Sequence, residues 1–177
     1  DSALSLTHQE VTTAISKLSS RKAPGPDGIP SDLYKSDPLI WGPILTKVIN
    51  AGIKLGLLSS WSQALNIPIF KKGSAPHCYR LISLIDTVVK VVGQVVLDCL
   101  ADWDRENKII REAQYGFRPG RSTQDQCLNL HLLIGKYTLI KHFPIYLGFM
   151  DLSTAFDSVN RQKLWRLLAN WSLSRFW

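Results

Sequence analysis

The chain has 177 residues, of which 45% are hydrophobic and 20% charged, with 11 Gly and 9 Pro. This is the composition of a globular protein, so it excludes a disordered chain, a collagen and a small disulfide-bonded scaffold. Lys and Arg total 21 against 14 Asp and Glu, a net charge of +7. This charge suggests an anionic binding partner, with nucleic acid first and an acidic membrane surface second. The alternative is a basic surface without a specific partner.

The first predicted helix begins after Thr7. Thr7 and Glu10 have the spacing of a capping box, and an apolar face at helical spacing follows them. The next segment, 23–30, contains three Pro and two Gly, which excludes a helix or a central strand and predicts a shaped loop. A second helix is predicted from Pro38, with Gly56 as its C-terminal stop.

The hydrophobic period then changes from helical to extended. Residues 64–70 and 79–85 are predicted to form the two strands of a β-hairpin, whose tip carries Lys71 and Lys72. An apolar helix is predicted over 88–103. The sequence therefore places a basic hairpin between two helical regions.

A second loop rich in Gly and Pro spans 114–121 and carries two arginines. Ser122 and Asp125 have the spacing of another capping box, which predicts a helix to about Tyr137. Residues 144–151 alternate in the manner of a strand. Helices dominate and are accompanied by a few strands, so the predicted fold class is α+β. A final predicted helix carries on one side Leu164, Leu167, Leu168 and Trp171.

The cysteines and the chain ends indicate the kind of protein. Cys78, Cys99 and Cys127 are far apart and form no C-x-x-C pair, which predicts neither a zinc site nor a disulfide framework and favours a reducing, intracellular compartment. The sequence predicts no signal peptide and no membrane span. The chain starts without Met and ends on the apolar Trp177, so we expect a fragment of a longer protein.

The sharpest local feature surrounds Asp151. The predicted strand over 144–151 places its carboxylate on the same side as Ile145 and Phe149, where a charge is unfavourable unless it is paired or binds a metal. Mg²⁺ takes one or two protein carboxylates together with phosphate oxygens. A carboxylate that caps the following turn is the commoner explanation, and the local sequence alone favours it.

Four stretches follow one another along the chain: KAPGPDGI at 22–29, IPIFKKG at 67–73 with YRLISL at 79–84, QYGFRPGRST at 114–123, and FMDLSTAFDSV at 149–159. In this order they resemble the reverse transcriptase domain of non-long-terminal-repeat (LINE-type) retrotransposons, and the resemblance covers nearly the whole chain. It implies a partial right-hand polymerase domain over 1–177, with the fingers at about 1–143 and the start of the palm at about 144–177.

The resemblance assigns roles in the last stretch. Asp151 matches a catalytic aspartate that holds both Mg²⁺ ions of a two-metal nucleotidyl transfer, and Leu152 would offer its backbone carbonyl to one ion. Thr154 and Ala155 match positions whose backbone runs past the triphosphate. Phe156 matches the ring that lies under the incoming sugar and excludes a 2′-hydroxyl, with simple core packing as the alternative.

The resemblance also implies two basic contacts. Lys71, Lys72 and Arg80 would bind the triphosphate, because Arg grips phosphate oxygens in a bidentate way. The alternative for the two lysines is a solvated hairpin tip. Arg118 and Arg121 would contact backbone phosphates of the template and read no bases.

The sequence also departs from the family pattern. Leu81 stands where Pro usually follows the arginine, and no Asp-Asp dipeptide occurs anywhere in the chain, so the later palm motif is missing, as is the thumb. The predicted function is an RNA-directed DNA polymerase present as a fragment, with an RNA template, a DNA primer and deoxynucleoside triphosphates as partners, no membrane partner, and the cytoplasm and nucleus as expected compartments. The alternatives are a catalytically inactive remnant that at most binds nucleic acid, and a basic α+β domain whose carboxylates are structural.

Overall fold

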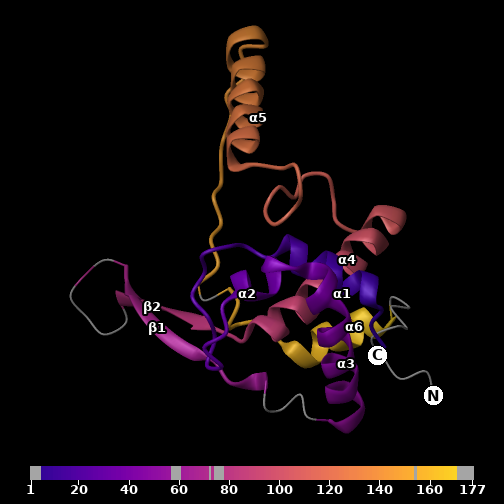
Figure 1. Ribbon diagram of the computed structural model, residues 1–177. Coiled ribbons are helices and arrows are strands. Elements are labelled where there is room, and N and C mark those ends of the chain that lie inside the picture. The colour runs from indigo at the N-terminus through magenta and orange to yellow at the C-terminus, as the bar shows by residue number, and fades with distance from the viewer. Residues whose placement is uncertain (1–4, 57–60, 72, 74–77, 154, 171–177) are drawn as a thin grey trace. The chain divides into compact units, whose positions relative to one another are not determined.

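The computed structural model describes residues 5–56, 61–71, 73, 78–153 and 155–170. The chain divides into two compact units, Asp1–Glu106 and Asn107–Trp177, which we call the N-terminal unit and the C-terminal unit and describe separately (Figure 1). The described part is rich in helices and contains one two-stranded antiparallel sheet. This is the mixed α+β composition that the sequence predicts.

A membrane span was not expected from the sequence. Among the described residues, no helix combines the length and the apolar character that crossing a bilayer requires.

Helix α1 (His8–Lys17) begins at the predicted capping box. The Glu10 backbone N–H donates to the Thr7 hydroxyl oxygen at 3.3 Å, and the Thr7 backbone N–H donates to a Glu10 carboxylate oxygen at 2.8 Å. Just before the cap, Leu6 exchanges two hydrogen bonds with the Asn50 side chain, at 2.8 and 2.9 Å. The start of α1 is therefore fixed by its own capping box and by a side chain 44 residues further along the chain.

Two helices follow the Pro- and Gly-rich loop. The short α2 (Ser31–Ser36) was not predicted, since six residues are too few to display a helical period. Helix α3 (Pro38–Leu55) begins and ends as predicted. The Asp37 carboxylate accepts hydrogen bonds from two backbone N–H groups in its first turn, and Gly56 ends it in the left-handed conformation at φ 66°.

The hydrophobic core of the N-terminal unit lies among α1, α2, α3 and helix α4 (Thr87–Asn107). Helices α1 and α3 approach closely where Gly42 faces Thr12, because a Cβ at Gly42 would overlap the Thr12 hydroxyl. Gly42 has no side chain and that of Thr12 is short, which allows the two helices to pack against each other. The buried apolar residues are Leu6, Val11, Ala14, Ile15, Leu18, Tyr34, Leu45, Ile49, Val91 and Val95.

The predicted hairpin is present as β1 (Leu65–Phe70) and β2 (Tyr79–Leu84), which pair antiparallel with Ile69 opposite Arg80. At the end of the ladder the rings of Phe70 and Tyr79 meet edge to face, with centroids 5.5 Å apart. Nearly all side chains of both strands are exposed. The hairpin is therefore held by its own ladder and cross-strand pairs, with little burial.

In the C-terminal unit, α5 (Thr123–Gly135) continues as a short π-helix, η3 (Lys136–Ile140), a few residues past the predicted end. The capping box at Ser122 is confirmed, since its hydroxyl accepts from the backbone N–H of Asp125 at 3.1 Å. The last described helix is α6 (Arg161–Asn170). No described residue of this unit is buried.

The predicted strand over 144–151 is wrong. These residues have no strand conformation, and within the described ranges β1 and β2 form the one sheet. Alternating apolar residues indicate which face of a strand could be buried, but a strand also needs a neighbour to complete its ladder of hydrogen bonds. None of the described segments pairs with 144–151. In the last predicted helix, Trp171 lies outside the described residues.

Candidate nucleic-acid interface

The hairpin places two of the predicted triphosphate-binding residues on one face. The Lys71 backbone N–H donates to the Cys78 carbonyl at 2.7 Å, which continues the ladder one pair past the ends of β1 and β2. Residues directly opposite each other share a face, and successive residues alternate. Because Ile69 pairs with Arg80, this register puts Lys71 and Arg80 on the same face.

Neither of these cations is neutralised by the part of the chain that the structure describes. Lys71 and Arg80 are exposed, and neither side chain makes a hydrogen bond or an ion pair with another described residue. Lys72 lies outside the described residues. Within the described ranges, the hairpin end thus offers an anion two positive charges that have no counter-charge.

The base of the hairpin is fixed by the first Gly/Pro loop. The Asp27 backbone N–H donates to the Asp86 carboxylate at 3.0 Å, and the Thr87 hydroxyl donates to the Ile29 carbonyl at 2.8 Å. Gly25 lies so close that a Cβ would overlap the backbone just after β2. The first two sequence motifs are therefore neighbours, and the loop supports the strand that carries Arg80.

Tyr34 lies beneath this junction. Its side chain is buried, at 4% exposure, and its ring meets Trp41 edge to face with centroids 5.3 Å apart. Burial raises the pKa of the Tyr34 phenol above its ordinary value of 10.0, and the negative charges of Asp27 and Asp86 raise it further. The phenol therefore stays neutral beside these two carboxylates.

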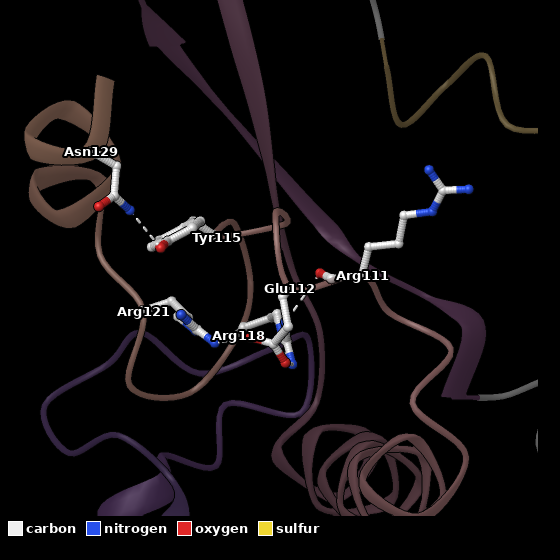
Figure 2. Close-up of polar contacts among 6 residues, drawn as sticks. All are labelled: Arg111, Glu112, Tyr115, Arg118, Arg121 and Asn129. Carbon is white, nitrogen blue, oxygen red and sulfur yellow. Dashed lines mark hydrogen bonds and ion pairs between the residues drawn. The ribbon is translucent and has the colours of Figure 1, made fainter. Parts of the chain in front are cut away.

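In the basic loop over 114–121, both predicted template-binding arginines contact one carboxylate (Figure 2). Arg118 lies 3.5 Å from a Glu112 oxygen and also donates to the Arg111 carbonyl at 3.1 Å. Arg121 binds the other Glu112 oxygen. The side chain of Arg111 points away from this group (Figure 2). We call Glu112, Arg118 and Arg121 the arginine–glutamate cluster.

Further contacts hold the cluster in shape. The Arg121 guanidinium lies over the ring of Tyr115, 5.1 Å from its centroid. The Tyr115 hydroxyl accepts a hydrogen bond from the Asn129 side chain of α5 at 2.7 Å. The two arginine side chains are 19% and 32% exposed, whereas that of Glu112 is 77% exposed. The cluster is thus a preorganised cationic surface that carries its own counter-charge.

The sequence analysis missed Glu112. No motif contains it, and its sequence separation from the two arginines, six and nine residues, matches no helix or strand period. Its position just before a loop with two arginines was the single feature that could have suggested a contact.

Asp151 lies in an irregular, exposed segment. Its carboxylate makes no hydrogen bond or ion pair with the described residues, so the predicted turn-capping role finds no support there. Leu152 is 74% exposed, and Thr154 lies outside the described residues. The Ala155 carbonyl accepts a hydrogen bond from the Ser158 hydroxyl at 3.0 Å, which orders the turn after Asp151.

The described residues do not by themselves fit a pair of magnesium ions. A two-ion site holds its ions about 3.5–4 Å apart between several carboxylates, and the described residues contain no group of three or more His, Cys, Asp or Glu that could hold an ion. Asp151 therefore provides at most one part of such a site.

A pair of aromatic rings joins the Asp151 segment to the basic loop. Phe156 meets Phe117 edge to face, with centroids 6.3 Å apart and planes at 81°. Phe117 has a left-handed backbone, with φ 62°, and its side chain is 95% exposed. This conformation is uncommon for a bulky residue. The predicted template-contacting loop and the predicted nucleotide-binding segment thus meet within one unit, through a residue that the sequence analysis did not select.

Comparison with known proteins assigns the chain to a family. The family described as reverse transcriptase (RNA-dependent DNA polymerase) matches residues 69–177, which include the end of β1, all of β2, the basic loop and the Asp151 segment. The chain belongs to the reverse transcriptase family. The match confirms the resemblance drawn from the four sequence motifs.

Individual relatives come from mobile elements. The chain is 30% identical over 155 residues to a protein named as a probable RNA-directed DNA polymerase from transposon BS of Drosophila melanogaster, and 29% identical over 160 residues to the RNA-directed DNA polymerase from mobile element jockey of the same species. These alignments cover 85% and 87% of this chain but 17% of each relative. The chain spans about a sixth of the length of the curated relatives it matches.

Proposed function

We propose that the chain forms part of an RNA-directed DNA polymerase of a LINE-type retrotransposon. The observation that carries the proposal is the position of Asp151, exposed and unpaired among the described residues, inside the segment that matches the reverse transcriptase family. A carboxylate that binds metal and substrate must be reachable and must not already be satisfied by a neighbour. As far as the described residues go, Asp151 meets both conditions.

In this proposal, about 1–143 are the fingers and about 144–177 are the start of the palm. The hairpin is exposed, and its two cations have no counter-charge among the described residues, which supports a role in covering the nucleotide. Lys71 and Arg80 would bind the triphosphate, together with Lys72. The loop at 23–30 would hold the base of the hairpin.

The C-terminal unit would bind the template and the sugar. Arg118 and Arg121 would contact template phosphates, and the ring of Phe156 would select deoxynucleotides by excluding a 2′-hydroxyl. The contact between Phe156 and Phe117 supports this arrangement, because it links the ring to the loop that carries both arginines. The backbone at Thr154 and Ala155 would run past the triphosphate.

Magnesium chemistry belongs to the complete polymerase in this proposal. Asp151, with the Leu152 carbonyl, would contribute ligands to Mg²⁺ ions, and further carboxylates would be needed to complete the site. We accordingly expect no primer extension by the 177 residues alone. The template RNA, the DNA primer and the deoxynucleoside triphosphates are the proposed partners, and the cytoplasm and nucleus the proposed compartments.

The test is primer extension on an RNA template by the polypeptide translated from the whole reading frame that contains this chain. Incorporation of deoxynucleotides supports the polymerase. Template binding without any incorporation would instead support the second candidate, an inactive remnant that only binds nucleic acid. One observation favours that candidate. The arginine–glutamate cluster presents two arginines that could contact phosphates, and such contacts need no metal ligands.

A further inference from the structure

The N-terminal unit contains an open groove whose lining includes none of the residues proposed to act in polymerisation. Its cavity volume is about 270 Å³, which is room for roughly nine waters at about 30 Å³ each. None of the described residues that line it is acidic. We call it the three-lysine groove, and its polar lining residues are Lys17, Lys22 and Lys90 with Ser19, Ser31 and Gln94.

Two contacts between α2 and the end of α1 form one wall of the groove. The Ser31 hydroxyl donates to the Ser19 carbonyl at 2.8 Å. The Lys35 ammonium donates to the Leu18 carbonyl at 2.6 Å and so satisfies an acceptor at the C-terminal end of α1. The Lys35 ammonium and the Ser31 hydroxyl are thereby both engaged, and Ser19 and Ser31 form part of the lining.

Helix α4 forms the facing wall. Lys90, Gln94 and Asp98 are four residues apart, so they lie along one face of the helix. Asp98 binds the Lys17 ammonium at 2.8 Å and accepts a hydrogen bond from the Gln94 side chain at 3.0 Å. The charge of Lys17 is therefore matched, and the surplus charge of the groove belongs to Lys22 and Lys90.

These two lysines have no counter-charge within the described ranges. Neither side chain makes a hydrogen bond or ion pair with another described residue. Lys90 is also half-buried. An ammonium group that has lost part of its water is stabilised by an anion, so the groove is set up to receive one.

We propose that the three-lysine groove binds backbone phosphates of a nucleic-acid strand, through residues that belong neither to the hairpin nor to the basic loop. The lining has cations, hydroxyls and an amide but no aromatic ring among its described residues. Such a lining can hold phosphates but offers no surface on which a base could stack. A backbone contact needs no base recognition, which favours a strand over a mononucleotide.

The test measures binding of the 177-residue chain to a short fluorescent single-stranded RNA by anisotropy over a range of NaCl concentrations, without metal or nucleotide. Each phosphate contact on a single strand contributes about 0.7 to the slope of log K against log salt. The double variant Lys22→Gln/Lys90→Gln is therefore expected to bind more weakly at low salt and to lower the slope by about 1.4. The variant Lys22→Arg/Lys90→Arg, which keeps both charges, should retain the wild-type slope.

The matched control is Lys47→Gln/Lys54→Gln, which removes the same charge from exposed positions of α3 outside the groove. An equal loss in the control would mean diffuse attraction and would overturn the proposal, as would a wild-type chain that binds no RNA. Circular dichroism verifies that each variant is folded.

Inorganic phosphate is added at constant ionic strength and should compete weakly with the RNA. A groove that takes up inorganic phosphate, with RNA binding unchanged in the groove variant, would identify a free-phosphate site instead.

Discussion

At the scale of single residues, Glu112 determines how much positive charge the basic loop offers to a nucleic acid. Its carboxylate contacts both Arg118 and Arg121, and it is far more exposed than either arginine. A phosphate that approaches the loop must compete with this carboxylate. Exposed ion pairs contribute only about 0.2–1 kcal/mol each, so a strand with several phosphates can displace it.

Replacing Glu112 should therefore strengthen RNA binding. Glu112→Gln removes the competing charge, and a gain of about 1 kcal/mol corresponds to roughly fivefold higher affinity at low salt. Fluorescence anisotropy measures the change. The control is Glu106→Gln, which alters the net charge equally at an exposed residue outside the cluster. Equal gains in both variants, or no gain in either, would argue against the arginines as RNA contacts.

The raised pKa of Tyr34 predicts how the free energy of unfolding depends on pH in the alkaline range. Its pKa is raised in the folded chain by burial, and further by Asp27 and Asp86. The ordinary pKa of a tyrosine is 10.0. Above this pH, the unfolded chain loses the phenol proton while the folded chain keeps it. The contribution of Tyr34 to the free energy of unfolding is therefore fully present below pH 10.0 and is lost as the pH rises through the folded pKa.

Tyr34→Phe removes this titration. Urea unfolding at a series of pH values should give the variant a smaller loss of unfolding free energy above about pH 10 than the wild type. Tyr146→Phe is the matched control, since Tyr146 is 92% exposed. Identical alkaline profiles for wild type and Tyr34→Phe would show that the raised pKa does not couple to folding.

At the scale of elements, the first Gly/Pro loop and the hairpin depend on each other. Gly25 leaves no space for a side chain against the backbone at Ile85 and Asp86. This close approach explains why the sequence has Gly there. It also predicts that a change in the loop will disturb the strand that carries Arg80.

A pair of glycine substitutions tests this contact. Gly25→Ala should destabilise the chain by about 1–3 kcal/mol, because the added methyl must displace backbone atoms. Gly93→Ala in α4 meets nothing within 4 Å and should stabilise it by up to about 1 kcal/mol, since Ala favours a helix interior. Urea unfolding gives both values. An unchanged stability in Gly25→Ala would contradict the close packing of loop and hairpin.

Elements defined by local chemistry could be predicted from the sequence. Both capping boxes and the stop at Gly56 depend on residues a few positions apart, and the hairpin pairs two segments that follow each other directly along the chain. The strand over 144–151 could not be judged in this way, because pairing is a property of two segments. The apolar residues of 144–151 do alternate, but no described segment pairs with them as a neighbouring strand.

At the scale of the whole molecule, the buried core belongs to the N-terminal unit, and none of the described residues of the C-terminal unit is buried. The residues proposed to act chemically are nevertheless divided between both units. The sequence motifs identified the candidate residues but could not predict Glu112 or Phe117, whose contacts depend on the folded path of the loop. Family membership and local geometry together support the polymerase proposal.

The most direct test of that proposal is primer extension on an RNA template by the polypeptide translated from the whole reading frame, compared with two aspartate variants. Asp151→Asn should abolish incorporation of deoxynucleotides and leave template binding unchanged, because it removes the proposed metal ligand but no cation. Asp157→Asn removes the same charge six residues further on and should retain measurable activity, since the proposal assigns no metal ion to Asp157. Equal activity of wild type and Asp151→Asn would contradict the account.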